Sequence, residues 1–411
     1  MRKIKLGLIG AGERGGNSYA PYALKYPNEV AFTCVAEPID ERRNAIAAQH
    51  HIPSEQCYPY GMDLLAAKPE VDGIIIATQD RQHYELAMEA LAAGYHVLLE
   101  KPMAETLEKT RAIVAQAEKH QRLLIVCHVL RYTPFFSGMK KIIESGAIGK
   151  IQAVHHLENI GNFHFAHSYV RGNWHNTVES TPMIVAKCCH DMDILNFLIG
   201  KKCERLSSFG SLSYFTPENA PEGAAARCIE CEHNKRCIFS AYNYLVPRGM
   251  YPGFKNIVLR TDDPQVFLEH LDQSPYSRCV FDGHNDACDR QAVMMEYEGG
   301  ITATFTVSAF SNDISRKIKI MGSLGEIEGT LEENKFVVRD FGTGNETTHD
   351  LIAAKTLHSG GDEKIMECFC AALKDPAQAL LQYSASQSLE GHVMAFEAEE
   401  SRLHGGQVID L

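Results

Sequence analysis

A glycine-rich loop directly follows the first apolar segment, and this order constrains the fold more than any other feature. Residues 4–9 (IKLGLI) form a short apolar run, and Gly10, Gly12 and Gly15 follow it in the pattern Gly-x-Gly-x-x-Gly. The first glycine permits a tight turn, the second lets the backbone approach a pyrophosphate, and the third lets a helix pack on a strand. The helix N-terminus then offers free N–H groups to phosphates. The pattern predicts a strand, turn and helix that bind a dinucleotide.

An acidic residue ends the second apolar run. Glu37 follows residues 30–36 (VAFTCVA), at the distance from the loop where a carboxylate can bind the ribose hydroxyls of a dinucleotide. Its charge would repel a 2′-phosphate, so the sequence favours NAD over NADP. Arg42 and Arg43 lie one helical turn later and could reach a phosphate, which leaves NADP open as an alternative.

Apolar runs alternate with amphipathic segments up to about residue 130. This alternation predicts a parallel sheet with helices on both faces, so residues 1–128 are expected to form an NAD(P)-binding Rossmann domain of the doubly wound α/β class. The further apolar runs are 71–78, 95–100 and 123–129, and the helical segments are 83–93 and 106–121.

The pattern of apolar and polar residues changes after about residue 130. Consecutive strand-like segments separated by glycine turns predict a large, mostly antiparallel sheet. We therefore expect residues 129–411 to form an α+β domain for substrate binding and oligomerisation, with a loop-rich, cysteine-containing insertion around 215–285. The expected strands are 291–298, 301–310, 315–321, 325–331 and 335–340, and the expected helices are 138–149, 183–199, 362–374 and 385–403.

Charge and hydropathy restrict the class of partner. The net charge of -12 gives no indication of a nucleic acid or a membrane surface as a partner. No apolar run approaches the roughly 20 residues that a membrane-spanning helix needs. We therefore expect a cytoplasmic protein whose 13 cysteines are mostly reduced.

Three cysteines cluster in the loop-rich insertion. Cys228, Cys231 and Cys237 have the spacing C-x2-C-x5-C, which suits a tetrahedral metal ion. Spacing does not fix the fourth ligand, for which Cys279 is the first candidate and His233 the second. A structural zinc ion is the favoured interpretation, with an iron–sulfur cluster or free thiols as alternatives.

The sequence resembles the Gfo/Idh/MocA oxidoreductases, which include glucose–fructose oxidoreductase and inositol dehydrogenases. The Glu100-Lys101-Pro102 motif is the most specific part of this resemblance, which covers nearly the whole chain. Besides the glycine loop, the segments that carry it are Thr78 with His83, AGYHVLLEKPMAET (93–106), RYTPFF (131–136), SGAIGKI (145–151), HDMDILNFLIG (190–200) and SLEGHVMAFEAEESR (388–402).

The resemblance implies a role for each residue near this motif. Lys101 would contact both the substrate and the nicotinamide ribose, while Thr78, His83 and Glu100 would line the cofactor. A lysine at the carboxyl edge of a parallel sheet can also exchange a proton with an alcohol while a hydride moves. The sequence therefore predicts a catalytic Lys101.

The second half of the site departs from the family pattern. The family often has an aspartate four residues before a histidine, but here Ala186 precedes His190. His190 could act alone, with Lys101, or with Lys187, so both His190 and Lys187 are candidate catalytic residues. Asp191 and Asp193 are expected to be solvated or helix-capping carboxylates.

Three residues are candidates for substrate contact. Arg131 follows the fifth apolar run, with His128 just before it. Arg171 and Trp174 lie in a segment where the resemblance implies contacts with sugar rings, and an indole face suits a sugar. A structural role is an alternative for Arg131, and a core position is an alternative for Trp174.

These observations favour an NAD-dependent oxidoreductase acting on a CH–OH group of a sugar, cyclic polyol or sugar derivative. Lys101 and His190 would handle the hydroxyl proton. An alternative is an NAD-dependent glycosidase that works by transient C3 oxidation and elimination, and a remoter one is a non-catalytic NAD-binding regulator. The resemblance also implies a homodimer or homotetramer.

Overall fold

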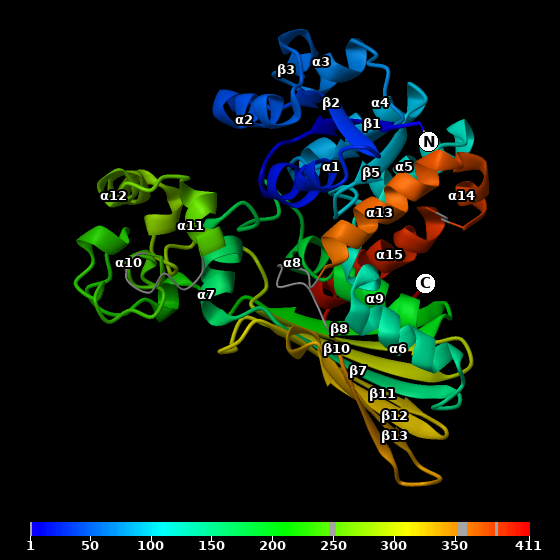
Figure 1. Ribbon diagram of the computed structural model, residues 1–411. Coiled ribbons are helices and arrows are strands. Elements are labelled where there is room, and N and C mark those ends of the chain that lie inside the picture. Colours follow the sequence, from blue (N-terminus) through cyan, green and yellow to red (C-terminus); the bar gives the residue numbers. More distant parts are fainter. Residues whose placement is uncertain (1, 246–251, 352–359, 383–384) are drawn as a thin grey trace.

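The structure is a computed structural model that describes residues 2–245, 252–351, 360–382 and 385–411. Its first sheet is parallel and has the strand order β3-β2-β1-β4-β5-β6. Apolar strands suit this sheet because helices cover both of its faces (Figure 1). The strands are β1 (Ile4–Ile9), β2 (Val30–Ala36), β3 (Cys57–Tyr58), β4 (Gly73–Ile76), β5 (His96–Leu99) and β6 (Leu124–Val126).

The strand order reverses between β1 and β4, and open α/β sheets bind ligands outside the carboxyl ends of strands at such a point. The glycine loop follows β1 there. Helix α5 of this half begins at a side-chain cap. Thr106 accepts a hydrogen bond from the backbone N–H of Lys109 at the start of α5. The helical segments are η1 (Glu13–Tyr19), α1 (Pro21–Lys25), α2 (Asp40–His50), η2 (Ser54–Gln56), α3 (Gly61–Ala66), η3 (Asp80–Gln82), α4 (His83–Ala92) and α5 (Leu107–His120).

The second sheet has nine strands in the order β14-β13-β12-β11-β7-β10-β9-β8-β15. Only β7 and β10 pair in parallel; the other neighbouring strands are antiparallel. The strands are β7 (Ile151–Asn159), β8 (Cys203–Ser211), β9 (Arg290–Tyr297), β10 (Ile301–Ser308), β11 (Ser315–Gly322), β12 (Gly325–Thr330), β13 (Lys335–Asp340), β14 (Glu346–Asp350) and β15 (Ile409–Asp410).

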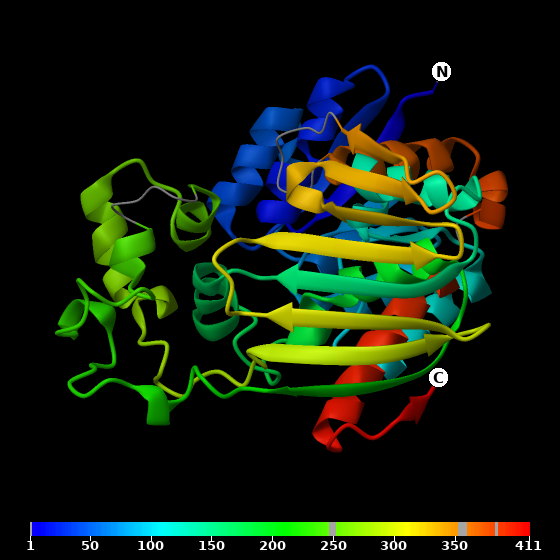
Figure 2. The same cartoon turned by 90° about the horizontal axis from the view of Figure 1, so that it is seen from below.

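Helices cover one face of this sheet and fill the space between the two sheets (Figure 1). Figure 2 looks onto the opposite face, where the described strands carry no helix. The helical segments from residue 129 to the insertion are η4 (Val129–Tyr132), α6 (Pro134–Glu144), α7 (Asn162–Phe165), η5 (Ala166–Arg171), α8 (Met183–Ala186) and α9 (Cys189–Ile199). A short turn, η9 (Leu331–Glu333), lies between β12 and β13. The helices after β14 are α13 (Gly361–Lys374), α14 (Pro376–Gln382) and α15 (Ala385–Leu403).

Helix α13 comes late in the chain but packs on the first sheet. Ile365, Met366 and Phe369 are buried in the same core as Leu6 and Leu8 of β1. The first sheet therefore takes part of its cover from residues beyond 360. The domain boundary near residue 128 stays a prediction.

The insertion projects to one side of the second sheet, beyond the ends of its strands (Figures 1 and 2). Its helices share a small core with Phe163 of α7, and this core includes Phe267 and Leu271 of α12. Residues 246–251 lie outside the described part. The helical segments are η6 (Pro217–Asn219), η7 (Cys228–Glu230), α10 (Ala241–Tyr244), α11 (Pro252–Val258), α12 (Pro264–Gln273) and η8 (Pro275–Ser277).

The expected α/β class and the mostly antiparallel second sheet are confirmed, but two helix predictions were inaccurate. The helix expected over 183–199 is divided into α8 and α9, with Lys187 and Cys188 between them. The helix expected over 138–149 occupies Pro134–Glu144, because Thr133 caps it and Pro134 starts it. Among the described residues, every helix is too short or too polar to cross a lipid bilayer.

Candidate active site

The glycine loop has the geometry that its three glycines suggest. Gly10 has a φ of +91°, and a Cβ there would lie 2.4 Å from the carbonyl oxygen of Ala77. A Cβ on Gly15 would lie 1.9 Å from the carbonyl oxygen of Gly10. A Cβ on Gly12 would meet no atom nearer than a guanidinium nitrogen of Arg42, at 4.0 Å. The first and third glycines are thus needed for packing, whereas the second faces open space.

Glu37 is buried against this loop. One of its carboxylate oxygens accepts a hydrogen bond from the backbone N–H of Ala11 (2.7 Å), and the other accepts one from Ile39 (3.1 Å). Arg43 donates to the carbonyl oxygen of Glu37 (2.5 Å) and pairs with Asp40. The carboxylate is therefore fixed beside the loop, and Arg43 is held behind it.

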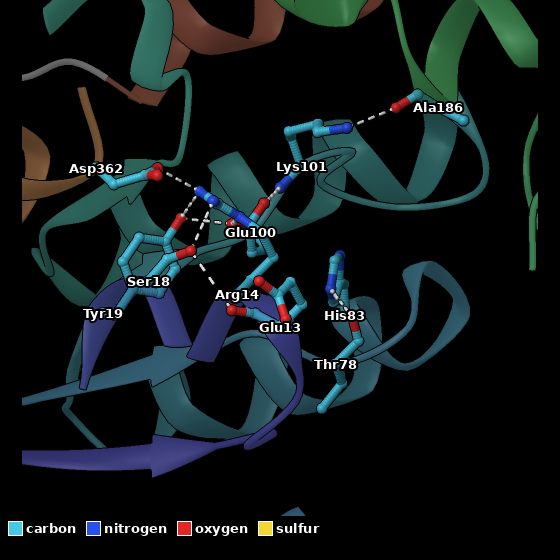
Figure 3. Close-up of polar contacts among 10 residues, drawn as sticks. All are labelled: Glu13, Arg14, Ser18, Tyr19, Thr78, His83, Glu100, Lys101, Ala186 and Asp362. Carbon is cyan, nitrogen blue, oxygen red and sulfur yellow. Dashed lines mark hydrogen bonds and ion pairs between the residues drawn. The ribbon is translucent and has the colours of Figure 1, made fainter. Parts of the chain in front are cut away.

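Glu100 is the centre of a buried network at the end of β5 (Figure 3). Arg14 of the glycine loop lies 2.6 Å from a Glu100 oxygen, which also accepts a hydrogen bond from the Tyr19 hydroxyl. Arg14 contacts Asp362 of α13 as well, at 2.7 Å. Burial alone would raise the pKa of Glu100, but Arg14 and Tyr19 hold it below its usual value. The second Glu100 oxygen accepts from the backbone N–H of Lys101 (3.0 Å).

The Lys101 side chain extends away from this network toward the second half of the chain. Its ammonium donates a hydrogen bond to the carbonyl oxygen of Ala186, the last residue of α8, at 2.8 Å (Figure 3). Position 186 is where the family resemblance implies an aspartate. Here a backbone carbonyl contacts the lysine, and His190 follows one helical turn later.

His83 connects two loops that flank Lys101. Its Nδ1 lies 2.7 Å from the carbonyl oxygen of Pro102, and its Nε2 lies 3.2 Å from that of Thr78. The Thr78 hydroxyl is buried and has no hydrogen-bond partner among the described residues. An unsatisfied buried hydroxyl costs free energy unless a ligand or water reaches it.

His190 is buried on α9 and packs against other histidines. Its ring lies 5.8 Å from that of His128, which stacks on His392 of α15 at 5.2 Å. His392 Nε2 accepts a hydrogen bond from the backbone N–H of Met103 (3.0 Å), and its Nδ1 faces the carbonyl of Ser388. Burial lowers the pKa of His392 to about 3, so this ring stays neutral. The loop after Lys101 is thereby tied to α15.

The expectation that Asp193 is solvated is wrong. Its carboxylate is 1% exposed, contacts His128 at 2.5 Å and accepts two hydrogen bonds from Arg131, each 2.6 Å. Burial alone would raise the pKa of Asp193, but His128 and Arg131 lower it to about 2. This bidentate contact favours a positioning role for Arg131 over the predicted substrate contact.

Asp191 is also fully buried, contrary to expectation, and belongs to a second ionic network. It lies 2.8 Å from His156 and 2.9 Å from Arg316 of β11. Arg316 reaches Glu158 of β7 at 3.0 Å, and Glu158 pairs with Lys187 at 3.1 Å. The predicted catalytic Lys187 is therefore held by a carboxylate that is itself fully buried.

Trp174 joins the two halves of the chain. Its indole N–H donates to Asp80, which follows β4, at 3.2 Å, and the Ser180 hydroxyl donates to the same carboxylate at 2.9 Å. Arg81 donates to the carbonyl of Thr177 (2.9 Å). Trp174 thus lies close to the first sheet, although no observation tests its predicted contact with a sugar.

Arg171, the last residue of η5, lies farther away and contacts the insertion. It is 4% exposed and donates to the carbonyl oxygens of Arg278 (2.6 Å) and Phe239 (2.7 Å). These contacts favour a structural role over the predicted substrate contact. Cys228, Cys231, Cys237 and Cys279 line one small cavity next to it.

Several residues of the site were not predicted from the sequence. They contribute through contacts between distant segments, for which spacing gives no signal. Arg14 lies within the glycine motif, but nothing in that motif indicates its contact with Glu100. These residues are Arg14, Tyr19, Asp80, Glu158, Arg316, Asp362 and His392.

Comparisons with known proteins agree with this architecture. Residues 4–128 match the model of the Gfo/Idh/MocA oxidoreductase family described as an NAD-binding Rossmann fold. Residues 140–369 match that family's C-terminal alpha/beta domain.

The chain belongs to the Gfo/Idh/MocA oxidoreductase family.

Individual relatives are distant. The putative oxidoreductase YteT of Bacillus subtilis is 24% identical over 68% of this chain and 64% of its own length. Inositol 2-dehydrogenase 2 of Saccharopolyspora erythraea is 27% identical over 48% of this chain and 55% of its own length. The chain therefore spans less than two thirds of either of these curated relatives.

The fold is also that of solved structures. An inositol dehydrogenase homolog from Azotobacter vinelandii, solved with NAD+, superimposes with a TM-score of 0.71 at 17% identity. The match covers 100% of this chain and 98% of that one. Together with the family match, this confirms the predicted fold and the predicted NAD-binding oxidoreductase family.

Proposed function

We propose that this chain is an NAD-dependent oxidoreductase that transfers a hydride between a nicotinamide cofactor and a sugar, cyclic polyol or sugar derivative. The observation that carries the proposal is the contact of Lys101 with Ala186, which puts an ammonium group between the two sheets. The names of relatives, such as inositol 2-dehydrogenase and levoglucosan dehydrogenase, support the substrate class.

The residues around the glycine loop fit a dinucleotide. The open space at Gly12 suits a pyrophosphate, and Glu37 lies where it would bind ribose hydroxyls. The buried Thr78 hydroxyl has a free hydrogen-bonding position among the described residues. Bound NAD supplies the acceptor for a hydride. The fixed Glu37 carboxylate favours NAD over NADP, although Arg42 beside Gly12 could meet a phosphate.

Lys101 is proposed to exchange the proton of the reacting hydroxyl. Its backbone is held by Glu100, so its side chain projects from a fixed point. His190, one turn after Ala186, is the second candidate for the proton, and its packing against His128 restricts its ring. A positioned general acid or base of this kind contributes roughly 10²–10⁴-fold to a rate.

The reaction is tested with purified protein, NAD and a panel of sugars, inositols and sugar derivatives. Net oxidation should raise the absorbance at ~340 nm, the band of the reduced nicotinamide. Release of nitrophenol from a nitrophenyl glycoside without net NADH would replace the dehydrogenase with the glycosidase alternative. NAD binding without turnover of any substrate would favour the non-catalytic regulator. Parallel assays with NADP test the cofactor preference.

A Lys101→Ala variant tests the catalytic assignment. We expect a fall in kcat of about 1,000-fold, with NAD affinity nearly unchanged. The matched control is Lys119→Ala, which removes an exposed lysine from α5 and should leave kcat unchanged. Full turnover by Lys101→Ala would refute the role of Lys101.

We also propose a cytoplasmic homodimer or homotetramer that associates through the outer face of the second sheet. Met294 of β9 and Phe209 of β8 are 66% and 62% exposed, and their neighbours Val293 and Ser208 are buried, so the two exposed side chains point to the outer face. Large exposed apolar side chains favour an interface. Light scattering should report two or four copies, and Met294→Asp should lower that number. Cell fractionation tests the location.

A further inference from the structure

The insertion brings four cysteines to one cavity that is separate from the candidate active site. The cavity measures about 30 Å³, and its wall includes all four thiol-bearing residues predicted from the sequence. Cys228 is the first residue of the turn η7, and Cys231 directly follows this turn. Cys237 comes six residues later, and Cys279 comes from the far end of the insertion. Residues from two distant segments thus meet around a space the size of a single ion or water molecule.

Backbone contacts align these two segments. Arg227 and Arg278 form an antiparallel bridge, and the N–H of Cys279 donates to the carbonyl of Ala226 at 2.8 Å. The Arg227 guanidinium donates to the carbonyl of Asp272 (2.6 Å), which ties the first segment to the end of α12. Cys228 and Cys279 therefore lie side by side because the backbone pairs next to them.

The chain around the first three cysteines has little other support. Between residues 217 and 240 the only helical segments are the single turns η6 and η7. Of the large apolar side chains in this stretch, Phe239 is buried in the core, whereas Ile229 and Ile238 are 50% and 67% exposed and add little to it. A segment with so few buried apolar side chains needs a cross-link to hold one conformation.

Arg171 gives an independent indication of what the cavity binds. Its guanidinium is buried, and one of its N–H groups points at the sulfur of Cys228, at 3.5 Å. Four thiolates around a divalent ion carry a net negative charge, which a buried cation next to the sulfurs would offset. Hydrogen bonds from outside to ligating sulfurs are also a regular feature of such sites.

We propose that Cys228, Cys231, Cys237 and Cys279 bind one structural zinc ion that fixes the insertion. Four thiolates in tetrahedral geometry are the usual ligands of structural zinc. His233, the other candidate for the fourth ligand, has its Nε2 2.7 Å from the carbonyl of Glu222 instead. Cys279 is therefore the better fourth ligand.

The four sulfur atoms lie too far apart to bind one ion together, so they must approach one another when zinc binds. Among the described residues, the group of possible ligand atoms within 4.8 Å of one another consists of His128, Cys189 and His392, not of these cysteines. That histidine group is not a second site, because His128 contacts Asp193 and His392 accepts from Met103. Zinc binding would draw the four cysteines together and tighten the insertion.

The test begins with elemental analysis of the full-length protein after gel filtration. We expect about one zinc per chain. Cys228→Ser and Cys279→Ser should each lower the zinc content at least about tenfold, since each removes one ligand. His233→Ala and Cys57→Ser are the matched controls. Cys57 lies in β3 of the first sheet, outside the insertion, and both variants should keep the ion.

A spectroscopic measurement covers the case in which a cysteine variant does not fold. Cobalt exchanged into the wild-type protein should give the intense visible bands of a tetrahedral tetrathiolate site. The absence of both zinc and a cobalt spectrum would overturn the proposal. Iron with stoichiometric sulfide would replace it with an iron–sulfur cluster. Disulfides among these cysteines in the freshly purified protein would also overturn it.

Discussion

The two sides of the candidate active site hold their charged groups in different ways. The cofactor side comprises the glycine loop and the end of β5, where the buried Glu100 meets Arg14 and Tyr19. Its other buried carboxylate, Glu37, accepts hydrogen bonds from backbone N–H groups. The substrate side comprises α8, α9 and the neighbouring ends of β7 and β11, where Asp191 and Glu158 share Arg316. The cofactor side therefore depends mainly on backbone shape, and the substrate side on the balance of buried charge.

The largest expected effect concerns that balance. Arg316→Met would leave two fully buried carboxylates with less positive charge nearby, and breaking a buried ion pair costs about 3–5 kcal/mol. We expect the free energy of unfolding to fall by about this amount in urea denaturation.

The matched control is Arg339→Met on β13 of the same sheet. Arg339 pairs with Glu326, Glu328 and Glu346 at the surface, where ion pairs contribute little to stability. Its removal should change the unfolding midpoint far less than the loss of Arg316. Equal effects of the two substitutions would show that buried charge does not distinguish the substrate side.

The second prediction tests the role of backbone shape on the cofactor side. Gly10→Ala would introduce a Cβ 2.4 Å from the carbonyl oxygen of Ala77 at a residue with a φ of +91°. We expect a loss of about 2–3 kcal/mol of unfolding free energy, because neither the strain nor the close contact can relax easily.

Gly12→Ala separates folding from cofactor binding in the same loop. The φ of Gly12 is -73°, and its Cβ would meet only open space and Arg42. The protein should unfold at nearly the wild-type denaturant concentration, yet its affinity for NAD should fall at least about tenfold, since the methyl group would lie where the pyrophosphate approaches. Unchanged NAD affinity in Gly12→Ala would contradict the assignment of this loop.

The contrast between the two sides also explains what could be predicted from the sequence. The glycine loop, Glu37 and Lys101 follow from local order, because each stands directly after an apolar strand and the carboxyl ends of parallel strands share one edge. The period-two alternation and the glycine turns likewise predicted the bounds of β9 to β13 to within a few residues.

Buried ionic contacts could not be predicted in the same way. Asp191 and Asp193 were expected to be solvated, because carboxylates on a helix usually are. Their partners, Arg316 and His128, lie in distant segments that only the folded chain brings together. The residue types alone give no indication that α9 is buried on nearly every side between the two sheets.

The next prediction concerns how the stability that Asp193 contributes depends on pH. The folded-state pKa of about 2 lies below the usual value of roughly 3.9. A carboxylate with a lowered pKa stabilises the fold above the unfolded-state pKa, and this contribution is lost as the pH falls through the folded-state pKa. The contribution of about 2–3 kcal/mol should therefore be complete at neutral pH and decline between about pH 4 and 2.

Comparison with Asp193→Asn isolates this contribution from those of other carboxylates. The variant should be less stable than the wild type at pH 6, and the difference should shrink as the pH approaches 2. Denaturant unfolding at a series of pH values measures both proteins. A difference that stays constant over this range would mean that the ion pairs with His128 and Arg131 do not hold the carboxylate charged.

The smallest expected effect comes from Lys187, whose pairing with Glu158 favours a structural role over the predicted catalytic role. Its ammonium pairs with Glu158, which keeps Arg316 as a second partner when Lys187 is removed. Lys187→Met should therefore lower kcat less than about tenfold, compared with about 1,000-fold for Lys101→Ala. A loss for Lys187→Met as large as that for Lys101→Ala would make Lys187 a catalytic residue, and the substrate side would then supply chemistry as well as charge balance.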